Sequence, residues 1–515
     1  MSLPKPVLYA LVALAVVWTA VIWLWPDATI GLTFDDAFYY FEIGQRMAAG
    51  EGSTFDGFRQ TNGYHPLWLL PCTLAHLVLP AGDATVRLLL GLQLVMALCG
   101  VGLALSGLRW SRGVTGGAVV AAVVLFAWLL VPMVLRTAVN GLESAVVVAV
   151  HGAILGLCLR HGSALHRWPV GRRIWLGALL GLAILSRTDG ALLTPLILLW
   201  TLPAAISERQ LLALVPVGIP PTAVLAGFLV TNQALFHTPL QVSGELKRVP
   251  PGLLGIAVIV GCMLLALALS EVARRGLLDR MTHVGHVVRQ SGFHAVFALA
   301  TLGYYTGLQT FARQWYFAPA VLWLTVLLVA GALDLAAKAR DDAPDKTPLA
   351  ALLPVTAILV VPLLGGAVYT AMQLAAPETL AVRKADLQAA AWLDEHLPPG
   401  ARVASWDAGL IGYHTDHPVM NLDGVVNDVA WLRAMRDGTA GDILVDEGVQ
   451  FVVNHGHYTG DECTTITDGL ERLRAPAPKR TLAAWPFEQT GRLNGEAWGR
   501  HKMAACVVSL QPREP

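Results

Sequence analysis

Charge is scarce in this sequence. Only 14% of its 515 residues are charged at neutral pH, against roughly one quarter in soluble domains, whereas 55% are apolar. So few charged side chains cannot cover the surface of a water-soluble globule of this length. The formal net charge is zero, so nothing indicates nucleic acid as a partner. The composition therefore predicts a protein whose main solvent is lipid.

Motifs for metal and nucleotide binding are also missing. No CxxC, no Cys/His cluster with zinc spacing and no DxD occurs, and no GKS or GxGxxG follows a strand-like segment. Four of the six cysteines lie in apolar segments: Cys72, Cys99, Cys158 and Cys262. The other two, Cys463 and Cys506, belong to the hydrophilic C-terminal part. We expect them to pair if that part lies in an oxidising compartment.

Long apolar runs predict eleven membrane spans, since about 20 apolar residues cross the hydrocarbon core. They lie near residues 7–25, 86–107, 115–135, 143–159, 174–187, 190–206, 211–230, 252–270, 291–309, 317–334 and 349–373. Residues 67–80 are apolar but too short, and are interpreted as a re-entrant or interfacial helix. Fifteen basic residues flank the spans on one side and eight on the other. The positive-inside rule then places the N-terminus in the cytoplasm and the C-terminal part outside.

The composition changes after residue 376. Residues 1–376 are predicted to form the transmembrane module, with a first outer loop at 26–84, and residues 377–515 a small extracytoplasmic α/β domain. Residues 384–397 have the pattern of an amphipathic helix that ends at Pro398. Short strands are predicted at 403–405, 419–421 and 451–454, between Gly, Asp and Asn turns.

The strongest chemical signal follows the first span, in the run TFDDAFYY. Phe34, Ala37, Phe38 and Phe41 recur at helical spacing, which predicts an amphipathic helix at the membrane surface. The acids at its start allow two interpretations that are compatible. Thr33 and Asp36 have the spacing of a capping box. Asp35 and Asp36 are also candidates for a general base that deprotonates an acceptor hydroxyl.

Further polar residues lie on the side of the membrane that is predicted to be outside. His65, in the run TNGYHPLW, either binds phosphate or orients the base, or is structural. Arg187 and Asp189 interrupt two apolar runs, where charges are costly and often functional, although a hinge with an internal ion pair also explains them. Lys247 and Arg248 are two basic residues on the side that the charge rule disfavours, which fits phosphate binding. Arg313 and Tyr316 are suited to a donor phosphate or a sugar ring.

The run DDAFYYFEIGQRMAAGEGSTFDG followed by TNGYHPLW resembles the first outer loop of bacterial GT-C glycosyltransferases. The resemblance is to the group with arabinofuranosyltransferases, protein O-mannosyltransferases and aminoarabinose transferases. It implies that Asp35 or Asp36 is the catalytic base and that HPLW opens a juxtamembrane helix. Gly141-x-Glu143 is similar to a motif of the second outer loop in this group. Residues 406–413 and 418–427 are similar to its outer domain.

The resemblance implies a GT-C-type α-helical polytopic protein of the bacterial inner membrane. It implies inverting transfer of a sugar from a polyprenyl-phosphate donor to a lipid, glycan or protein acceptor of the cell envelope. No cofactor is firmly implied, although the paired acids suit Mg²⁺ or Ca²⁺ as ligand types. A transporter or flippase is the alternative function. An unpaired charge next to lipid is costly. We therefore expect the charged residues at the outer side to converge on one outward-facing cavity: Asp36, Glu143, Lys247 and Arg313.

Overall fold

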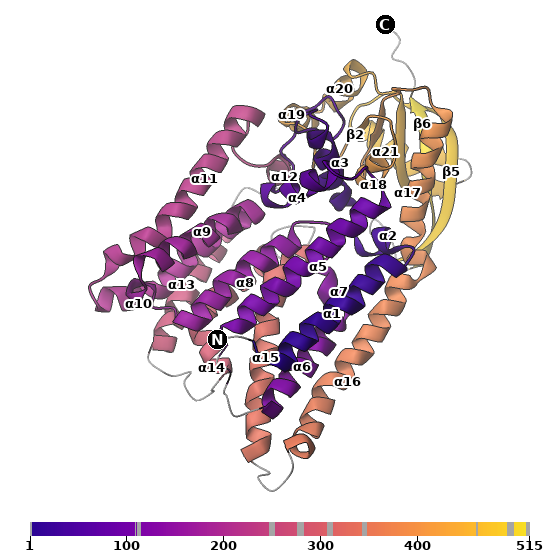
Figure 1. Cartoon of the computed structure of the whole chain (residues 1–515). Coiled ribbons are helices and arrows are strands. Elements are labelled where there is room, and N and C mark those ends of the chain that lie inside the picture. The colour runs from indigo at the N-terminus through magenta and orange to yellow at the C-terminus, as the bar shows by residue number, and fades with distance from the viewer. Residues whose placement is uncertain are drawn as a thin grey trace. The chain divides into compact units, whose positions relative to one another are not determined.

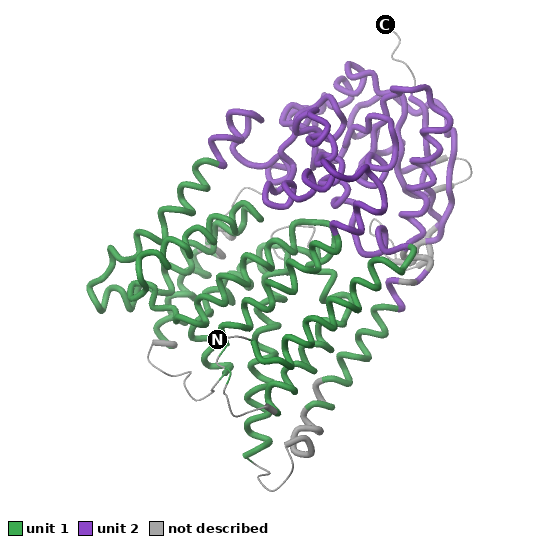
Figure 2. The backbone as a smooth tube through the Cα atoms, in the orientation of Figure 1, with its two compact units in different colours: residues 1–26, 90–227, 249–371 green, residues 27–89, 228–248, 372–515 purple. Residues whose placement is uncertain are grey.

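The structure, a computed structural model, divides the chain into two compact units. Unit 1 comprises residues 1–26, 90–227 and 249–371, and unit 2 comprises residues 27–89, 228–248 and 372–515 (Figure 2). The residues described are 3–108, 110, 115–246, 253–274, 283–305, 313–341, 348–459, 462–491 and 499–510. All structural statements below refer to these ranges, and each unit is described by itself.

Unit 1 is built from long apolar helices (Figure 1), although the ends of three of them, at residues 83–89, 228–236 and 372–375, are assigned to unit 2. They are α1 (Lys5–Leu24), α5 (Asp83–Ser106), α6 (Thr115–Leu130), α8 (Ser144–His161), α9 (Val170–Ser186), α10 (Leu193–Ser207), α11 (Val215–Phe236), α13 (Leu253–Arg274), α14 (Val284–Gly303), α15 (Ala318–Asp341) and α16 (Pro348–Ala375). Short segments connect them: α7 (Pro132–Arg136), η1 (Leu165–Arg167), η2 (Thr188–Leu192), η3 (Leu211–Leu214) and η5 (Gln314–Phe317).

Glycines bring α5 and α8 together at backbone distance. A Cβ atom at Gly152 would stand 2.1 Å from the carbonyl oxygen of Gly100. A Cβ atom at Gly156 would stand 2.3 Å from the carbonyl oxygen of Leu103. Since apolar side chains gain little by leaving lipid for a helix interface, such close packing of small residues is what holds membrane helices together.

A helix occupies each of the eleven ranges predicted to span the membrane. Six helical segments of the described ranges are long and apolar enough to cross a membrane: Lys5–Leu24, Asp83–Ser106, Ser144–His161, Thr188–Ser207, Leu211–Phe236 and Gln314–Asp341. Three shorter apolar helices cover Gly116–Leu130, Val260–Val272 and Val360–Leu374. The structure therefore supports a multi-pass membrane protein, while the count of eleven stays a prediction.

Unit 2 contains a mixed sheet with the strand order β2-β1-β3-β6-β5. The strands are β1 (Val403–Ser405), β2 (Val419–Asn421), β3 (Phe451–Thr459), β4 (Glu462–Cys463), β5 (Pro478–Gly491) and β6 (Gly499–Leu510). β1 pairs in parallel with both β2 and β3, whereas β6 pairs antiparallel with β3 and β5. The helices are α2 (Ala28–Leu32), α3 (Asp35–Ala48), α4 (Pro66–His76), α12 (Val242–Leu246), α17 (Pro377–His396), α18 (Gly409–Tyr413), α19 (Val429–Asp437), α20 (Ala440–Asp446) and α21 (Thr464–Arg472).

The first predicted outer loop belongs to unit 2 rather than to the helical unit. The guanidinium of Arg59 forms ion pairs with Asp428 at 2.8 Å and with Glu447 at 3.0 Å. The Thr61 hydroxyl donates a hydrogen bond to the carbonyl of Asn427 at 2.9 Å. The chain therefore does not divide at residue 376 alone, because residues 27–89 and 228–248 fold with residues 372–515.

Most of the helices and strands predicted for unit 2 match the structure, but the predicted capping box does not. The strands predicted at 403–405 and 419–421 match β1 and β2, and the one at 451–454 opens β3. The helix predicted at 384–397 overlaps α17, which ends one residue earlier. Residues 67–80 overlap the 11-residue helix α4, which is about 16 Å long at 1.5 Å per residue and too short to span hydrocarbon. The capping box was wrong: Phe34 is the N-cap of α3, and the Thr33 hydroxyl donates to the carbonyl of Thr29.

The predicted pairing of Cys463 with Cys506 is confirmed, with the two Cα atoms 6.5 Å apart. The bond closes a stretch of 43 residues, so replacing both cysteines by alanine should lower the free energy of unfolding by roughly 2–4 kcal/mol. Thermal unfolding with and without dithiothreitol checks this. The reductant should lower the unfolding temperature of the wild type to that of the double variant. Replacing the exposed free Cys99 by alanine is the control, and an unchanged wild-type transition under reductant would contradict the prediction.

The orientation of the chain in the membrane is testable with two cysteine probes in a variant that lacks the four free cysteines. Glu395 has a side chain that is 78% exposed and lies in α17, in the part predicted to be outside. Arg340 is exposed at the end of α15, on the side predicted to be cytoplasmic. A membrane-impermeant maleimide should label Glu395→Cys in intact spheroplasts and label Arg340→Cys only after lysis. The opposite pattern would reverse the predicted orientation.

Candidate functional site

Asp35 and Asp36 are the first two residues of α3, where carboxylates are favoured by the helix dipole. The backbone of Asp35 lies so close to α18 that a Cβ atom at Gly409 would stand 2.2 Å from the Asp35 carbonyl oxygen. This approach lets the Asp35 carboxylate accept hydrogen bonds from the backbone N–H groups of Gly409, at 3.0 Å, and Leu410, at 2.7 Å. Asp35 thus caps the first turn of the neighbouring helix.

Asp36 is half-buried beside Asp35. Its charge is one of those that raise the pKa values of Asp35 and Asp423. Burial is the main reason that the pKa of Asp423 rises to about 8, and the charges of Asp407 and Asp36 add to it. The acids at the start of α3 and the acids that follow the strands therefore form one electrostatic cluster within unit 2.

Three residues that the sequence analysis did not select complete this acid cluster: Asp386 of α17, Asp407 after β1 and His455 of β3. The Nδ1 atom of His455 lies 3.6 Å from Oδ1 of Asp386, and its Nε2 atom lies 3.4 Å from Oδ2 of Asp407. Asp386 is only 5% exposed. The imidazole thus bridges two carboxylates, and within the described ranges it is a cation placed among acids.

The same arrangement sets the pKa values. Burial raises the pKa of Asp35 to about 7, with Asp407 next in effect, against the hydrogen bond from Leu410. Burial lowers the pKa of His455, but Asp386, Asp407 and Asp35 outweigh it and raise the pKa to about 9. The cluster therefore holds groups that exchange protons near neutral pH, as acid–base catalysis requires.

These shifts predict that alkali destabilises unit 2. The pKa of His455 in the folded chain lies above its ordinary value, so its stabilising effect is complete below about pH 6.5 and is lost as the pH rises through about 9. Asp35 and Asp423 act in the same direction at lower pH, because their raised pKa values favour the protonated folded form. Between pH 8 and 9.5 the histidine contributes most of the loss, because the pKa values of Asp35 and Asp423 are lower, at about 7 and 8. Unfolding temperatures measured in this range report on it.

His455→Gln should be less stable than the wild type at pH 7, and its stability should fall less between pH 8 and 9.5. The matched control is His396→Gln, which replaces a histidine of α17 whose side chain is 45% exposed and should leave this alkaline limb unchanged. Equal alkaline losses in wild type and His455→Gln would show that another group is responsible.

Tyr39 braces the cluster from the next turn of α3. Its hydroxyl accepts hydrogen bonds from the Asn421 side-chain amide, at 3.0 Å, and from the Ala408 backbone N–H, at 3.3 Å. Asn421 in turn accepts the N–H of Gly424 through its Oδ1 atom, at 2.9 Å. The turns after β1 and β2 are thereby fixed against the same face of α3.

His65 makes hydrogen bonds at the start of α4. It is the N-cap residue of α4, and its backbone N–H donates to the Tyr40 hydroxyl at 3.1 Å. Its Nδ1 atom lies 2.7 Å from the side-chain amide nitrogen of Gln241. These contacts favour the structural interpretation of His65, as a junction between α4 and the segment before α12.

A second charged cluster lies within unit 1 and joins four of the predicted site residues. The Arg187 guanidinium bonds to Oε1 of Glu143 at 2.9 Å and to Oδ2 of Asp189 at 2.8 Å. It also lies over the ring of Tyr316, 4.8 Å from the centroid. Arg187 and Glu143 are 5% and 3% exposed. Tyr305 was not selected from the sequence, yet its hydroxyl donates to Asp189 at 2.9 Å and its ring stacks on Tyr316.

The other two cations predicted for the site are Arg313 and Lys247. Arg313 is exposed just before η5, and its guanidinium lies 6.0 Å from the ring centroid of Trp315. Lys247 lies outside the described residues. The predicted convergence of Asp36, Glu143, Lys247 and Arg313 joins residues of both units, so it stays a prediction. Across the described ranges, no group of three or more His, Cys, Asp or Glu side chains is arranged to hold a metal ion.

Comparisons with known proteins locate the fold. Residues 373–500 match a family model described as a domain of unknown function (DUF8728). No curated protein matches the chain. Among solved structures, the chain is similar to ArnT from Cupriavidus metallidurans in the apo state, with 16% identity, 97% of each chain covered and a TM-score of 0.53.

The same ArnT bound to undecaprenyl phosphate gives 15% identity, 97% coverage of each chain and a TM-score of 0.52. An oligosaccharyltransferase from Archaeoglobus fulgidus, in complex with zinc and sulfate, gives 16% identity and a TM-score of 0.49 over 86% of this chain and 67% of that one. The two ArnT structures are aminoarabinose transferases of the GT-C group, to which the first-loop motif was compared. The chain therefore has the fold of GT-C membrane glycosyltransferases.

Proposed function

We propose that this protein is an inverting glycosyltransferase that takes a sugar from a polyprenyl-phosphate carrier and attaches it to a cell-envelope acceptor. The observation that carries the proposal is the end-to-end likeness to an ArnT structure that holds undecaprenyl phosphate, together with two acids at the start of α3. The likeness supports the fold and the lipid carrier class. The acid cluster supplies proton-exchanging groups for the transfer.

In the proposed reaction, Asp36 accepts the proton of an acceptor hydroxyl. The oxygen then bonds to the anomeric carbon of the sugar while the bond between that carbon and the phosphate oxygen breaks. The polyprenyl phosphate leaves with the electron pair, and the configuration at the anomeric carbon inverts. Asp35 is less suited to this role, since its carboxylate accepts two backbone N–H groups of α18.

The leaving phosphate gains negative charge, which fixed cations stabilise. We assign this task to Arg313 and Lys247, the two cations predicted from the sequence. Arg187 is less suited, because it is already bonded to Glu143 and Asp189. Glu143 would act on the acceptor or balance the cations, and Tyr316, whose ring is stacked on Tyr305, would present an aromatic surface to the sugar.

Deletion of the gene in its host tests the proposal. Mass spectrometry of the lipid fraction should show a polyprenyl-phosphate sugar that accumulates, and the envelope glycans should lose one sugar. Re-expression of the wild type should reverse both changes. Unchanged carrier lipids and glycans in the deletion strain would contradict the proposal. Loss of the sugar from the outer face with accumulation of its carrier on the cytoplasmic leaflet would instead indicate a flippase.

A further inference from the structure

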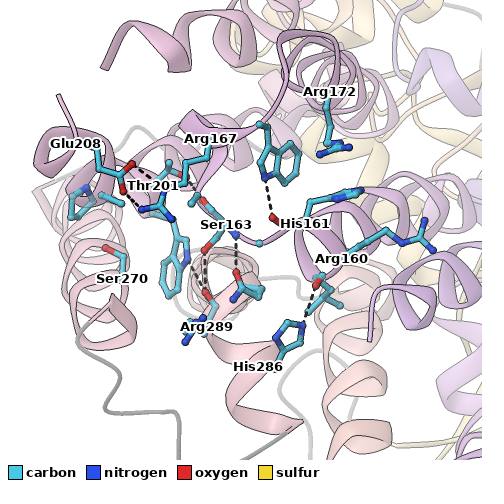
Figure 3. A pocket seen from close by; sticks show the side chains of 18 of the residues that line it. Arg160, His161, Ser163, Arg167, Arg172, Thr201, Glu208, Ser270, His286 and Arg289 are labelled. Carbon is cyan, nitrogen blue, oxygen red and sulfur yellow. Dashed lines mark hydrogen bonds and ion pairs between the residues drawn. The ribbon is translucent and has the colours of Figure 1, made fainter. Parts of the chain in front are cut away.

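We propose that unit 1 carries a binding site for the phosphate group of an anionic phospholipid, at the connection between α8 and α9. The site, here called the basic pocket, has a volume of about 700 Å³, within the range of pockets that hold small ligands. Its lining includes Arg160, Arg167, Arg172 and Arg289 (Figure 3). The inference does not depend on the proposed transfer reaction.

The pocket is built by hydrogen bonds that join three helices. Gly162 ends α8 with a φ of +82°, a conformation that favours glycine. The next residue, Ser163, donates through its backbone N–H to Oε1 of Gln290 in α14 at 2.7 Å. Its carbonyl accepts the hydroxyl of Thr201, from α10, at 2.8 Å. The backbone positions that frame the pocket are thus fixed before a ligand binds.

Arg289 stands at the centre of this framework. Its carbonyl oxygen accepts hydrogen bonds from the Ser163 hydroxyl and from the Trp200 indole N–H, each at 3.3 Å (Figure 3). A Cβ atom at Gly292 would stand 2.2 Å from the Trp200 ring, so the glycine lets the indole lie against α14. The backbone of α14 departs from helical geometry next to this contact, at Ser291. Trp200 therefore holds the backbone of Arg289 in place.

The charge of the lining favours an anion. Four arginines and one glutamate line the pocket, which gives a formal net charge of +3 with neutral histidines. The glutamate, Glu208, is bonded to Arg167 and to the imidazole of His166. Arg172 lies over the ring of Trp168, 5.8 Å from its centroid. Each arginine guanidinium can donate two hydrogen bonds to a phosphate group, so this lining suits a phosphate better than an apolar ligand.

The surroundings favour a lipid as the source of that phosphate. Val170, Ile174 and Trp175 of α9, which flank Arg172 in the sequence, are about half exposed. Such apolar side chains suit acyl chains, and indole rings such as those of Trp168 and Trp200 are typical of the membrane–water interface. The connection lies on the side that the basic residues predict to be cytoplasmic. Basic pockets between helices on that side are suited to anionic lipid headgroups.

The test uses the purified full chain, delipidated in a neutral detergent, and three probes: dihexanoyl phosphatidylglycerol, dihexanoyl phosphatidylcholine and inorganic phosphate. Binding is followed by native mass spectrometry and by the rise in unfolding temperature. We expect saturable binding of the phosphatidylglycerol and much weaker binding of the zwitterionic lipid. The double variant Arg172→Gln/Arg289→Gln should bind the phosphatidylglycerol roughly tenfold or more weakly, because it loses charge-assisted hydrogen bonds to the phosphate.

The matched control is Lys338→Gln/Arg340→Gln, which removes the same charge from exposed positions of α15 on the same predicted side. It should bind the phosphatidylglycerol like the wild type. Arg160→Gln is the second variant if the first fails to fold, as judged by its unfolding temperature without lipid. Equal binding by pocket and control variants, or equal binding of both lipids, would overturn the proposal. Inorganic phosphate that competes at the concentration of the lipid would overturn its assignment to a lipid.

Discussion

Replacing Asp36 by asparagine should lower the rate of sugar transfer by roughly 10²–10⁴-fold, the usual contribution of a general base. Asparagine keeps the size and polarity of the side chain but cannot accept the proton of the acceptor hydroxyl. The folded state should change little, because Asp36 lies in the first turn of α3 and is half-buried. The measurement is glycan restoration in the deletion strain, together with the amount of variant protein in the membrane.

Asp35→Ala is the matched comparison, because it removes the neighbouring carboxyl group. It leaves the N–H groups of Gly409 and Leu410 without the acceptor that they have in the wild type. Unsatisfied buried donors cost about 1–3 kcal/mol, so this variant should lose stability more than it loses catalysis. An Asp36→Asn variant that restores the glycans fully, or an Asp35 variant that is stable but inactive, would transfer the role of base to another group.

Sequence patterns sufficed where the signal is local. Turn residues mark the ends of the strands at 403–405 and 419–421, and apolar runs indicate the positions of the long helices. The β5–β6 hairpin escaped prediction because its strands, Pro478–Gly491 and Gly499–Leu510, mix lysine, arginine and glutamate with apolar residues. The capping box failed because Phe34 rather than Thr33 precedes the helix, a shift of one residue that spacing alone cannot resolve.

The acid cluster was only half visible in the sequence, for a topological reason. Asp407 and Asp423 each follow a predicted strand by two residues, and His455 comes directly after the third predicted strand. β1 pairs in parallel with β2 and with β3, so the carboxyl ends of these strands meet at one edge of the sheet. Parallel pairing is the signal that would have grouped them. The addition of Asp386, by contrast, depends on how α17 packs and has no local signature.

Replacing Arg187 by methionine should destabilise unit 1 by about 3–5 kcal/mol, since breaking a buried ion pair leaves a charge without its partner. Glu143 is 3% exposed and bonds to Arg187 at 2.9 Å, and Asp189 loses its bond to the same guanidinium. Methionine keeps an unbranched side chain of similar length. The loss of stability is therefore due to the missing charge more than to a change in side-chain volume. Thermal unfolding in detergent, followed by the tryptophan signal, measures the change.

A triple variant separates structure from chemistry in this cluster. Glu143→Gln/Arg187→Met/Asp189→Asn removes all three charges together, so most of the stability should return, as buried ion pairs are often replaceable without loss. If Glu143 acts on the acceptor, the triple variant should fold but transfer sugar slowly, and the single Glu143→Gln variant should show the same defect. If the cluster only joins α8 to η2, transfer should return with stability. An Arg187→Met variant as stable as the wild type would contradict the electrostatic argument itself.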